Sequence, residues 1–166
     1  MKKLAIVFDQ ILIVGAVMSC ALITVVMMSI ALDVVMRYFF GNPQIWVLET
    51  TEISLLYVTF LASAWVLKKE RHVKMDLLLN RLSPSAQALC NGITSIVGSI
   101  ICFIITSYSI LFTWDQFIRN VRRETLLNIP NGPIVVIIPI GCFLLFIQFL
   151  RRSSEYFAEW KSLRRH

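Results

Sequence analysis

Residues 82–114 read LSPSAQALCNGITSIVGSIICFIITSYSILFTW and contain no Asp, Glu, Lys or Arg. About 18 consecutive apolar residues suffice for a helix to cross the hydrocarbon core of a bilayer, so this stretch predicts a membrane-spanning helix. Three further stretches are also uncharged, at residues 10–32, 53–67 and 125–150. The shortest, 53–67, reaches spanning length only if the helix also takes in residues 46–52. We therefore expect four spans.

The composition excludes an ordinary soluble domain. Of the 166 residues, 57% are hydrophobic and 16% are charged, whereas about 25% charged residues are usual in soluble domains. The mean hydropathy is +0.74. We expect an all-α integral membrane protein that forms a single membrane domain over residues 1–166. Its transmembrane helices are predicted at about residues 8–38, 46–68, 84–115 and 130–152.

Small residues mark one face of the third predicted helix. They recur at alternating steps of three and four: Ser85, Ala88, Gly92, Ser95, Ser99, Cys102, Thr106, Ser109 and Thr113. Lipid gives helices no hydrophobic reason to associate, so close backbone approach across small residues becomes a main source of contact. This face is expected to pack against a helix of this chain or of a partner. The alternative is a chance repeat in a helix rich in Ser and Ile.

The basic residues predict the orientation in the membrane. Twelve of the sixteen Lys and Arg residues lie before residue 4, within residues 68–81 or after residue 150. The other four are Arg37, Arg119, Arg122 and Arg123. Because Lys and Arg in short loops stay on the cytoplasmic side, both termini and residues 68–81 are expected to be cytoplasmic.

Two segments outside the spans are predicted to lie along the lipid headgroups. Residues 71–82 are too short to span, and their apolar residues recur with helical spacing at Met75, Leu78, Leu79 and Leu82. This pattern predicts an amphipathic helix at the cytoplasmic interface. Pro84 suits the first position of a helix, so the next span begins there as a separate element. Residues 153–166 are predicted to continue the last helix as an amphipathic tail.

Charged residues gather near the far ends of the first two helices. Asp33 and Arg37 are four residues apart and can pair on one helical face. Glu49 and Glu52 are three apart and share a face, which must point into protein or water because an ionised carboxylate avoids lipid. These groups are candidates for a structural or docking network, for part of an ion path, or for solvated helix ends. Trp46 suits an interface anchor, with contact to a binding protein as the alternative.

Prolines are expected to shape the fourth helix. Pro130 and Pro133 both suit a helix's first turn, so the helix should begin near one of them. Pro139 lies further in and cannot donate to the carbonyl of Val135. A bend is therefore predicted there.

The sequence offers no recognisable catalytic, cofactor or metal site. Haem ligation in a helical bundle needs histidines within the spans, but His72 and His166 fall in polar segments. The four cysteines lie in uncharged stretches without a CxxC pair, which favours packing over redox chemistry. Basic residues do not interleave with aromatic ones as at a nucleic-acid surface. We expect no enzyme activity, catalytic residue, cofactor, bound metal ion or nucleic-acid partner.

The stretch from the end of the first helix to the interfacial segment resembles one known family. The features that carry the resemblance follow one another as Arg37-Tyr38, Trp46, Glu49, Phe60-Leu61-Ala62, and His72 with Asp76 four residues later. In this order and spacing the chain resembles the small membrane subunit of TRAP (tripartite ATP-independent periplasmic) transporters. It departs from many members at Ala62, where glycine is common, and this bears on how closely the second helix packs there.

The resemblance implies a subunit that depends on partners. In such systems a periplasmic substrate-binding protein delivers an organic anion to a large multi-span membrane subunit. The large subunit moves the anion inward with sodium by an elevator-like shift, while the small subunit braces its static scaffold in the bacterial inner membrane. The substrate is then bound outside this chain. An autonomous, homo-oligomeric four-helix transporter is the rival hypothesis, and a lone structural or signalling membrane protein is a third.

His72 and Asp76 have two readings under this resemblance. At i and i+4 on the interfacial helix they can form a local pair that caps the end of the second helix. Alternatively they contact the large subunit directly. A proton-shuttle role for His72 is a further alternative.

Overall fold

The computed structural model describes residues 2–70, 84–122 and 129–163. The predicted interfacial helix at 71–82 lies outside these residues. The helices are α1 (Lys2–Phe40), α2 (Ile45–Glu70), α3 (Pro84–Ile118), α4 (Asn131–Val135) and α5 (Ile137–Leu163). Four stretches are long and apolar enough to cross a membrane: Ile6–Phe40, Ile45–Lys69, Gln87–Ile118 and Asn131–Ala158. The prediction of an all-helical protein with four candidate spans is confirmed.

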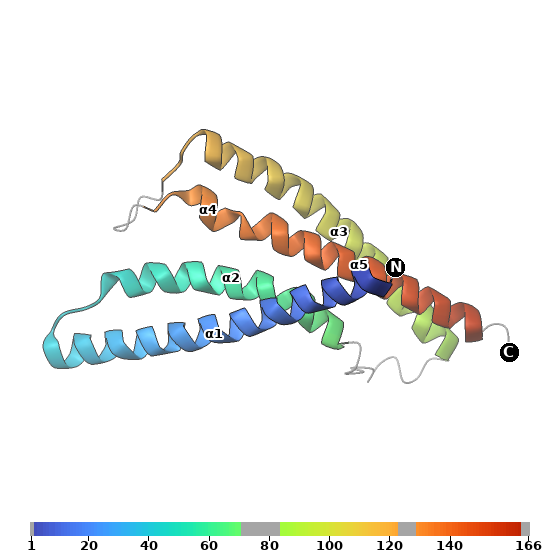
Figure 1. The fold of residues 1–166 in the computed structure, drawn as a ribbon, viewed down its shortest axis with the longest axis horizontal. Helices are drawn as coiled ribbons and strands as arrows, with labels where there is room; N and C mark the ends of the chain where they lie inside the picture. The colour runs from blue at the N-terminus through green and yellow to red at the C-terminus, as the bar shows by residue number, and fades with distance from the viewer. Residues whose placement is uncertain (1, 71–83, 123–128, 164–166) are drawn as a thin grey trace.

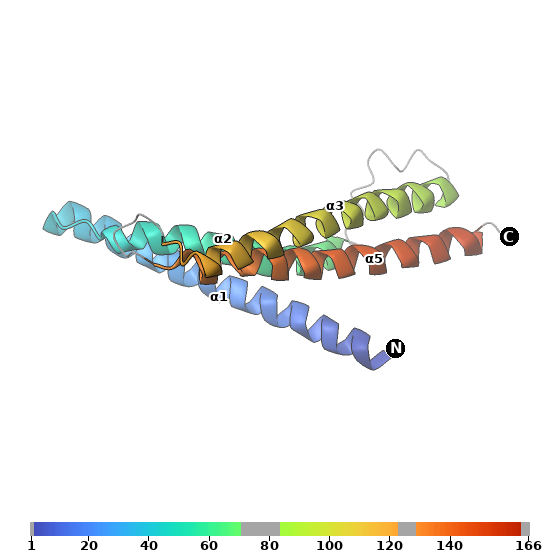
Figure 2. The ribbon, with the colours of Figure 1, turned by 90° about the horizontal axis from the view of Figure 1, so that it is seen from above.

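The helices form two antiparallel hairpins, α1 with α2 and α3 with α4 and α5 (Figure 1). The hairpins meet along α2 and α5, while α1 and α3 lie on the outer sides of the pair of hairpins. Figure 2 shows a long, thin molecule in which α5 runs between α3 and the N-terminal half of α1. The two chain termini lie toward one end, here called the terminal end, and residues 41–44 lie at the opposite, turn end.

The helices extend beyond the expected bounds. The first runs over Lys2–Phe40 instead of about 8–38, and the third reaches Ile118 instead of about 115. The expected bounds followed the uncharged stretches, but a helix continues through charged residues where these reach headgroups or water. The last helix continues without a break from its apolar part through to Leu163.

The turn between α1 and α2 depends on a glycine. Gly41 has φ +64°, a left-handed conformation that other residues adopt at a cost. The Asn42 N–H donates to the carbonyl of Met36 at 3.2 Å, and the Val47 N–H donates to that of Gln44 at 3.0 Å. The first helix therefore ends at this turn.

The fourth span is interrupted at Val136, between α4 and α5. Pro130 precedes α4, and Pro133 lies inside its first turn. The interruption directly follows Val135. Because Pro139 has no backbone N–H, it cannot donate a hydrogen bond to the Val135 carbonyl. The break therefore lies where the sequence predicts a bend.

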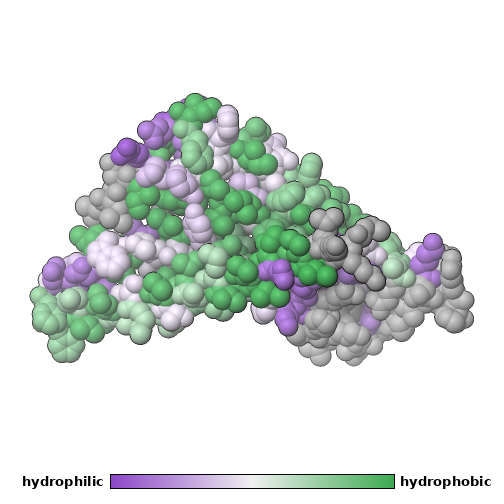
Figure 3. All heavy atoms as spheres, in the orientation of Figure 1, coloured by the Kyte–Doolittle hydropathy of each residue, from purple (hydrophilic) through white to green (hydrophobic). Residues whose placement is uncertain are grey.

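The buried core is small for a chain of this length. Its apolar residues lie where helices cross: Leu12, Val26, Val47, Ala64, Leu67, Ala88, Ile134, Val135 and Ile137. Most large apolar side chains are exposed, and they colour much of the face seen in Figure 3. Only 6% of the most apolar window of α2 is buried, and 33% in the last span. Such surfaces are stable only against lipid or a partner.

Candidate structural and docking site

At the turn end, Asp33 ties α1 to the start of α2. The side chain is largely buried, and its two oxygens have different partners. Arg37 Nη2 donates to Oδ2 at 2.7 Å, which is the i,i+4 pair that the spacing predicts. The backbone N–H of Gln44 donates to Oδ1 at 2.6 Å. Because Gln44 directly precedes α2, the carboxylate acts as a cap supplied from another helix.

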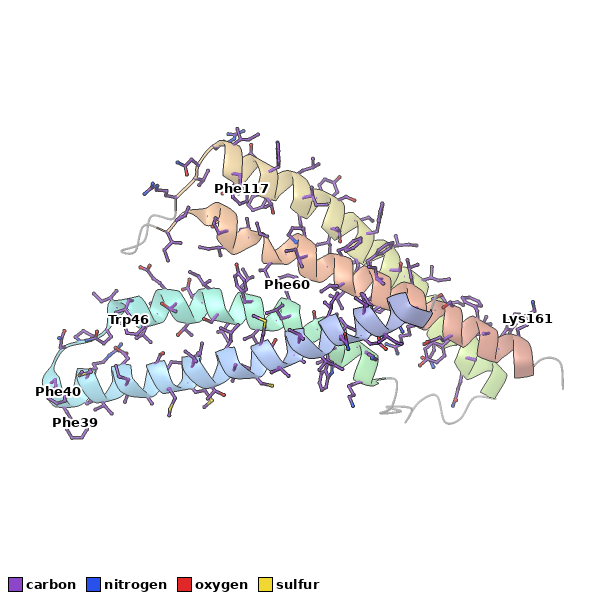
Figure 4. All side chains as sticks on the ribbon, viewed as in Figure 1. Phe39, Phe40, Trp46, Phe60, Phe117 and Lys161 are labelled. Carbon is purple, nitrogen blue, oxygen red and sulfur yellow. The ribbon has the colours of Figure 1, made fainter. Side chains whose placement is uncertain are left out.

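Trp46 belongs to the same turn. Its indole N–H donates to Gln44 Oε1 at 3.0 Å, and the residue remains 44% exposed. Figure 4 shows the labelled Trp46 at the beginning of α2, beside the turn that follows Phe40. An indole held at its polar edge and exposed elsewhere suits an interface between water and lipid or protein.

Glu49 and Glu52 follow on α2. Glu49 is half buried and Glu52 is exposed, and both engage in interactions within the protein. The structure therefore gathers Asp33, Arg37 and Trp46 into one bonded turn, with the two glutamates along the next turns of α2.

At the terminal end, a cluster that the sequence analysis missed joins three helices. Arg151 Nη1 of α5 donates to Oδ1 of Asp9 in α1 at 2.8 Å. Lys68 Nζ of α2 forms an ion pair with Oδ2 of the same carboxylate at 3.1 Å. The Arg151 guanidinium also lies over the Phe8 ring, 5.4 Å from its centroid. About a third of each charged side chain is exposed. The sequence signal was a single acidic residue directly before the first uncharged stretch, at the end of the chain where basic residues gather.

Three contacts join the two hairpins. Near the middle of α2, the Tyr57 hydroxyl donates to the Pro133 carbonyl of α4 at 2.9 Å. About one turn further along α2, Phe60 meets Gly141 of α5, where a Cβ on the glycine would lie 2.6 Å from Phe60 Cβ. Phe60 is labelled between these helices in Figure 4. At the terminal end the Asp9–Arg151 ion pair completes the set.

The small-residue face of α3 lies against α5. Ser95 and Ser99 are 2% and 4% exposed, and Cys102, Thr106 and Thr113 are also buried. Gly92 contacts the Phe157 ring of α5, where an added Cβ would be 3.2 Å from Cε2. By contrast Ile96, between the two serines, is 40% exposed. The stripe thus separates the buried from the exposed side of this helix.

Substitutions on this stripe are expected to be costly. Ser95→Leu or Ser99→Leu adds volume between α3 and α5 and should destabilise the chain by about 1–3 kcal/mol. Ile96→Leu, on the exposed side, should change little. Unfolding in mixed detergent and dodecyl sulfate micelles, followed by circular dichroism, measures the difference. Equal losses at positions 95 and 96 would show that the stripe has no packing role.

The other predicted residues lie elsewhere. His72 and Asp76 fall outside the described residues, so their pairing stays a prediction. Across residues 2–70, 84–122 and 129–163, no three His, Cys, Asp or Glu side chains lie together as a metal site requires. The described site can hold the helices at fixed positions and present surfaces to lipid or to a partner.

Known proteins match most of the chain. The family described as tripartite ATP-independent periplasmic transporters, DctQ component, matches residues 26–158. A TRAP transporter small permease protein of Haemophilus influenzae is 26% identical over 133 residues, covering 80% of this chain and 78% of that protein. The ectoine TRAP transporter small permease protein TeaB of Halomonas elongata is 23% identical over 118 residues, which cover 71% of this chain and 61% of TeaB.

Proposed function

The chain belongs to the DctQ family as a small permease subunit of a tripartite ATP-independent periplasmic transporter, so it is a transporter component and not an enzyme. From this membership we propose that it braces the static scaffold of a large multi-span subunit in the bacterial inner membrane. In this proposal the large subunit takes up an organic anion together with sodium. A periplasmic protein delivers the anion, which this chain does not itself bind.

The observation that carries the bracing role is the joining of the two hairpins by three contacts. A hydroxyl bond and a glycine contact connect them near the middle of α2, and an ion pair connects them at the terminal end. An elevator moves a substrate site past a fixed element, so that element has to keep its shape under lateral load. Two cross-connected hairpins with apolar outer flanks suit that requirement.

The distribution of polar side chains favours this role over an autonomous transporter. Ion-coupled transporters usually place ionisable groups near the midplane of broken helices. Within the described residues, charged residues such as Asp9, Asp33 and Arg151 lie toward the ends of the candidate spans. The buried polar residues further in, such as Ser19, Ser95 and Thr106, bond backbone carbonyls of their own helices.

Reconstitution separates the two hypotheses. A bracing subunit alone should move no solute in proteoliposomes, and it should co-purify with a much larger membrane protein encoded beside it. Uptake driven by a sodium gradient should appear only when this chain, the large subunit and the binding protein are combined. Uptake by a homo-oligomer of this chain alone would establish the rival hypothesis instead.

The proposed orientation places both termini in the cytoplasm, on the strength of the basic residues. Val121→Cys in a cysteine-free chain should then react with a membrane-impermeant maleimide added from the periplasm. Lys161→Cys should react only after the membrane is opened. Both positions are exposed. If Val121→Cys were labelled only from the cytoplasmic side, the chain would have the opposite orientation to the one proposed.

Glu49 tests whether the charges on α2 are structural. In a bracing network, Glu49→Ala should weaken assembly with the large subunit and uptake together, and Glu49→Gln should do less harm because it keeps the shape. In a sodium path, both substitutions should abolish coupling while the complex still assembles. A fully assembled and fully active Glu49→Ala variant would contradict both roles.

A further inference from the structure

The contacts of α1 with α2 define a length. Asp9 bonds Lys68 at the terminal end, and Asp33 bonds Gln44 at the turn end. Asp9 and Asp33 are about 24 residues apart, and so are Gln44 and Lys68. At ~1.5 Å per residue, each of these two stretches measures about 36 Å. The hydrocarbon core of a bilayer is about 30 Å thick. The two contacts thus lie near the two edges of the hydrocarbon.

Helix α1 continues beyond the Asp33 contact. Residues 34–40, here called the overhang, extend it by about 10 Å, and Figure 1 shows α1 reaching past the start of α2. Tyr38, Phe39 and Phe40 are 80%, 81% and 71% exposed. The labelled Phe39 points away from α2 in Figure 4. This is a concentration of exposed aromatic surface at one helix end.

The direction of the rings indicates what covers them. Successive helical residues differ by about 100°, so these three side chains face different sides of α1. A flat protein surface covers one side of a helix, whereas a lipid headgroup layer surrounds it. Tyr is enriched in that layer, and Phe side chains of interfacial helices enter the boundary between headgroups and acyl chains. Arg37, on the overhang, is bonded to Asp33 but its side chain remains 59% exposed, so it can also reach lipid phosphates.

The part of α1 from Asp9 to Phe40 has a length that fits this placement. From Asp9 to Phe40 it measures about 46 Å, and the bilayer with its headgroups measures about 40–45 Å. A tilt of about 20°, the average for membrane helices, reduces this distance to about 44 Å and brings Asp9 and Phe40 into the two headgroup layers. The terminal end has the matching composition, with Lys69 over Trp65, Arg151 over Phe8 and Arg152 over Tyr156.

We propose that the overhang is a lipid anchor. Tyr38, Phe39 and Phe40 insert among the headgroups of the leaflet at the turn end, Arg37 binds lipid phosphate, and Asp33 holds Arg37 on the helix. The anchor fixes the depth of the α1–α2 hairpin in the membrane. Its ligand is the phospholipid surface and not a protein, and it acts whichever way the chain is oriented.

Spin labels on the overhang test the proposal. Tyr38→Cys, Phe39→Cys and Phe40→Cys are made singly in a cysteine-free chain, labelled with a nitroxide and assembled with the large subunit. The complexes are placed in nanodiscs of phosphatidylethanolamine and phosphatidylglycerol. Power saturation then gives the accessibility of each label to oxygen and to a water-soluble nickel chelate. Leu55→Cys, on the exposed side of α2, provides the lipid reference, and exposed Lys161→Cys provides the aqueous one.

A lipid anchor predicts nickel accessibility between the two references at all three positions, with oxygen accessibility above that of the aqueous reference. Nickel accessibility equal to that of Lys161→Cys at the three positions would place the overhang in water. Low accessibility to both reagents at any position would mean that a protein covers that side. Either of these results would overturn the proposal.

Discussion

Gly141→Leu is expected to separate the two hairpins. An added Cβ would already lie 2.6 Å from Phe60 Cβ and 2.7 Å from Phe60 Cδ1, distances that require a helix to move. Overpacking of this kind costs about 1–3 kcal/mol for the first methyl group, and a leucine at a helix crossing should cost more. Unfolding in mixed micelles should show the loss, and co-purification with the large subunit should fall with it.

The neighbouring position supplies the control for Gly141. Ile140 is 48% exposed, so Ile140→Leu should leave both unfolding and assembly unchanged. The double variant Gly141→Ala with Phe60→Ala should regain only part of the stability that Gly141→Leu loses, because the close contact between the two Cβ atoms remains. If Gly141→Leu assembled as well as Ile140→Leu, the α2–α5 contact would not hold the hairpins together.

Asp33→Ala is expected to produce the second large effect. The substitution removes a bond to the Arg37 guanidinium and the cap on the Gln44 N–H, both made by a side chain that is 12% exposed. Charge-assisted hydrogen bonds contribute about 1.5–3 kcal/mol each, and a helix cap contributes about 1 kcal/mol. Since Arg37 is largely exposed, we expect a total loss of about 2–4 kcal/mol in the free energy of unfolding.

Asp33→Asn separates the contribution of the Arg37 bond from that of the Gln44 cap. The amide oxygen can still accept from Gln44, while the amide nitrogen cannot accept from Arg37. The variant should therefore lose about half as much as Asp33→Ala. Ser29→Ala, one turn earlier, removes only a bond to the Val25 carbonyl of its own helix and should be nearly silent. Equal stabilities of Asp33→Ala and Ser29→Ala would mean that the turn does not depend on the carboxylate.

Local patterns predicted the helices because they depend on nearby residues. Uncharged stretches predicted the four spans, and Pro139 predicted the interruption of the last helix. The Asp33–Arg37 pair followed from helical spacing in the same way. The bounds were less accurate because helices continue into headgroups, where charged residues are stable.

Contacts between distant residues could not be predicted in this way. Asp9 meets Arg151 across 142 positions, and Tyr57 meets Pro133 across 76. Periodicity shows which side of a helix is small or polar, but it does not identify the residue on the other helix. Gly141 illustrates the limit, because only the packed structure reveals that Phe60 lies against it. The joints between the hairpins, on which the bracing role rests, therefore emerged from the fold.

The distance between α2 and α5 during transport tests the bracing role most directly. Leu55→Cys and Ile140→Cys, both exposed, carry nitroxides in a cysteine-free chain assembled with the large subunit and the binding protein. Double electron–electron resonance measures their separation without substrate and with substrate and sodium. A brace predicts one unchanged distance distribution in both conditions while uptake proceeds. A shift of more than about 2 Å between them would show that the two hairpins move relative to one another during transport and would contradict the bracing role.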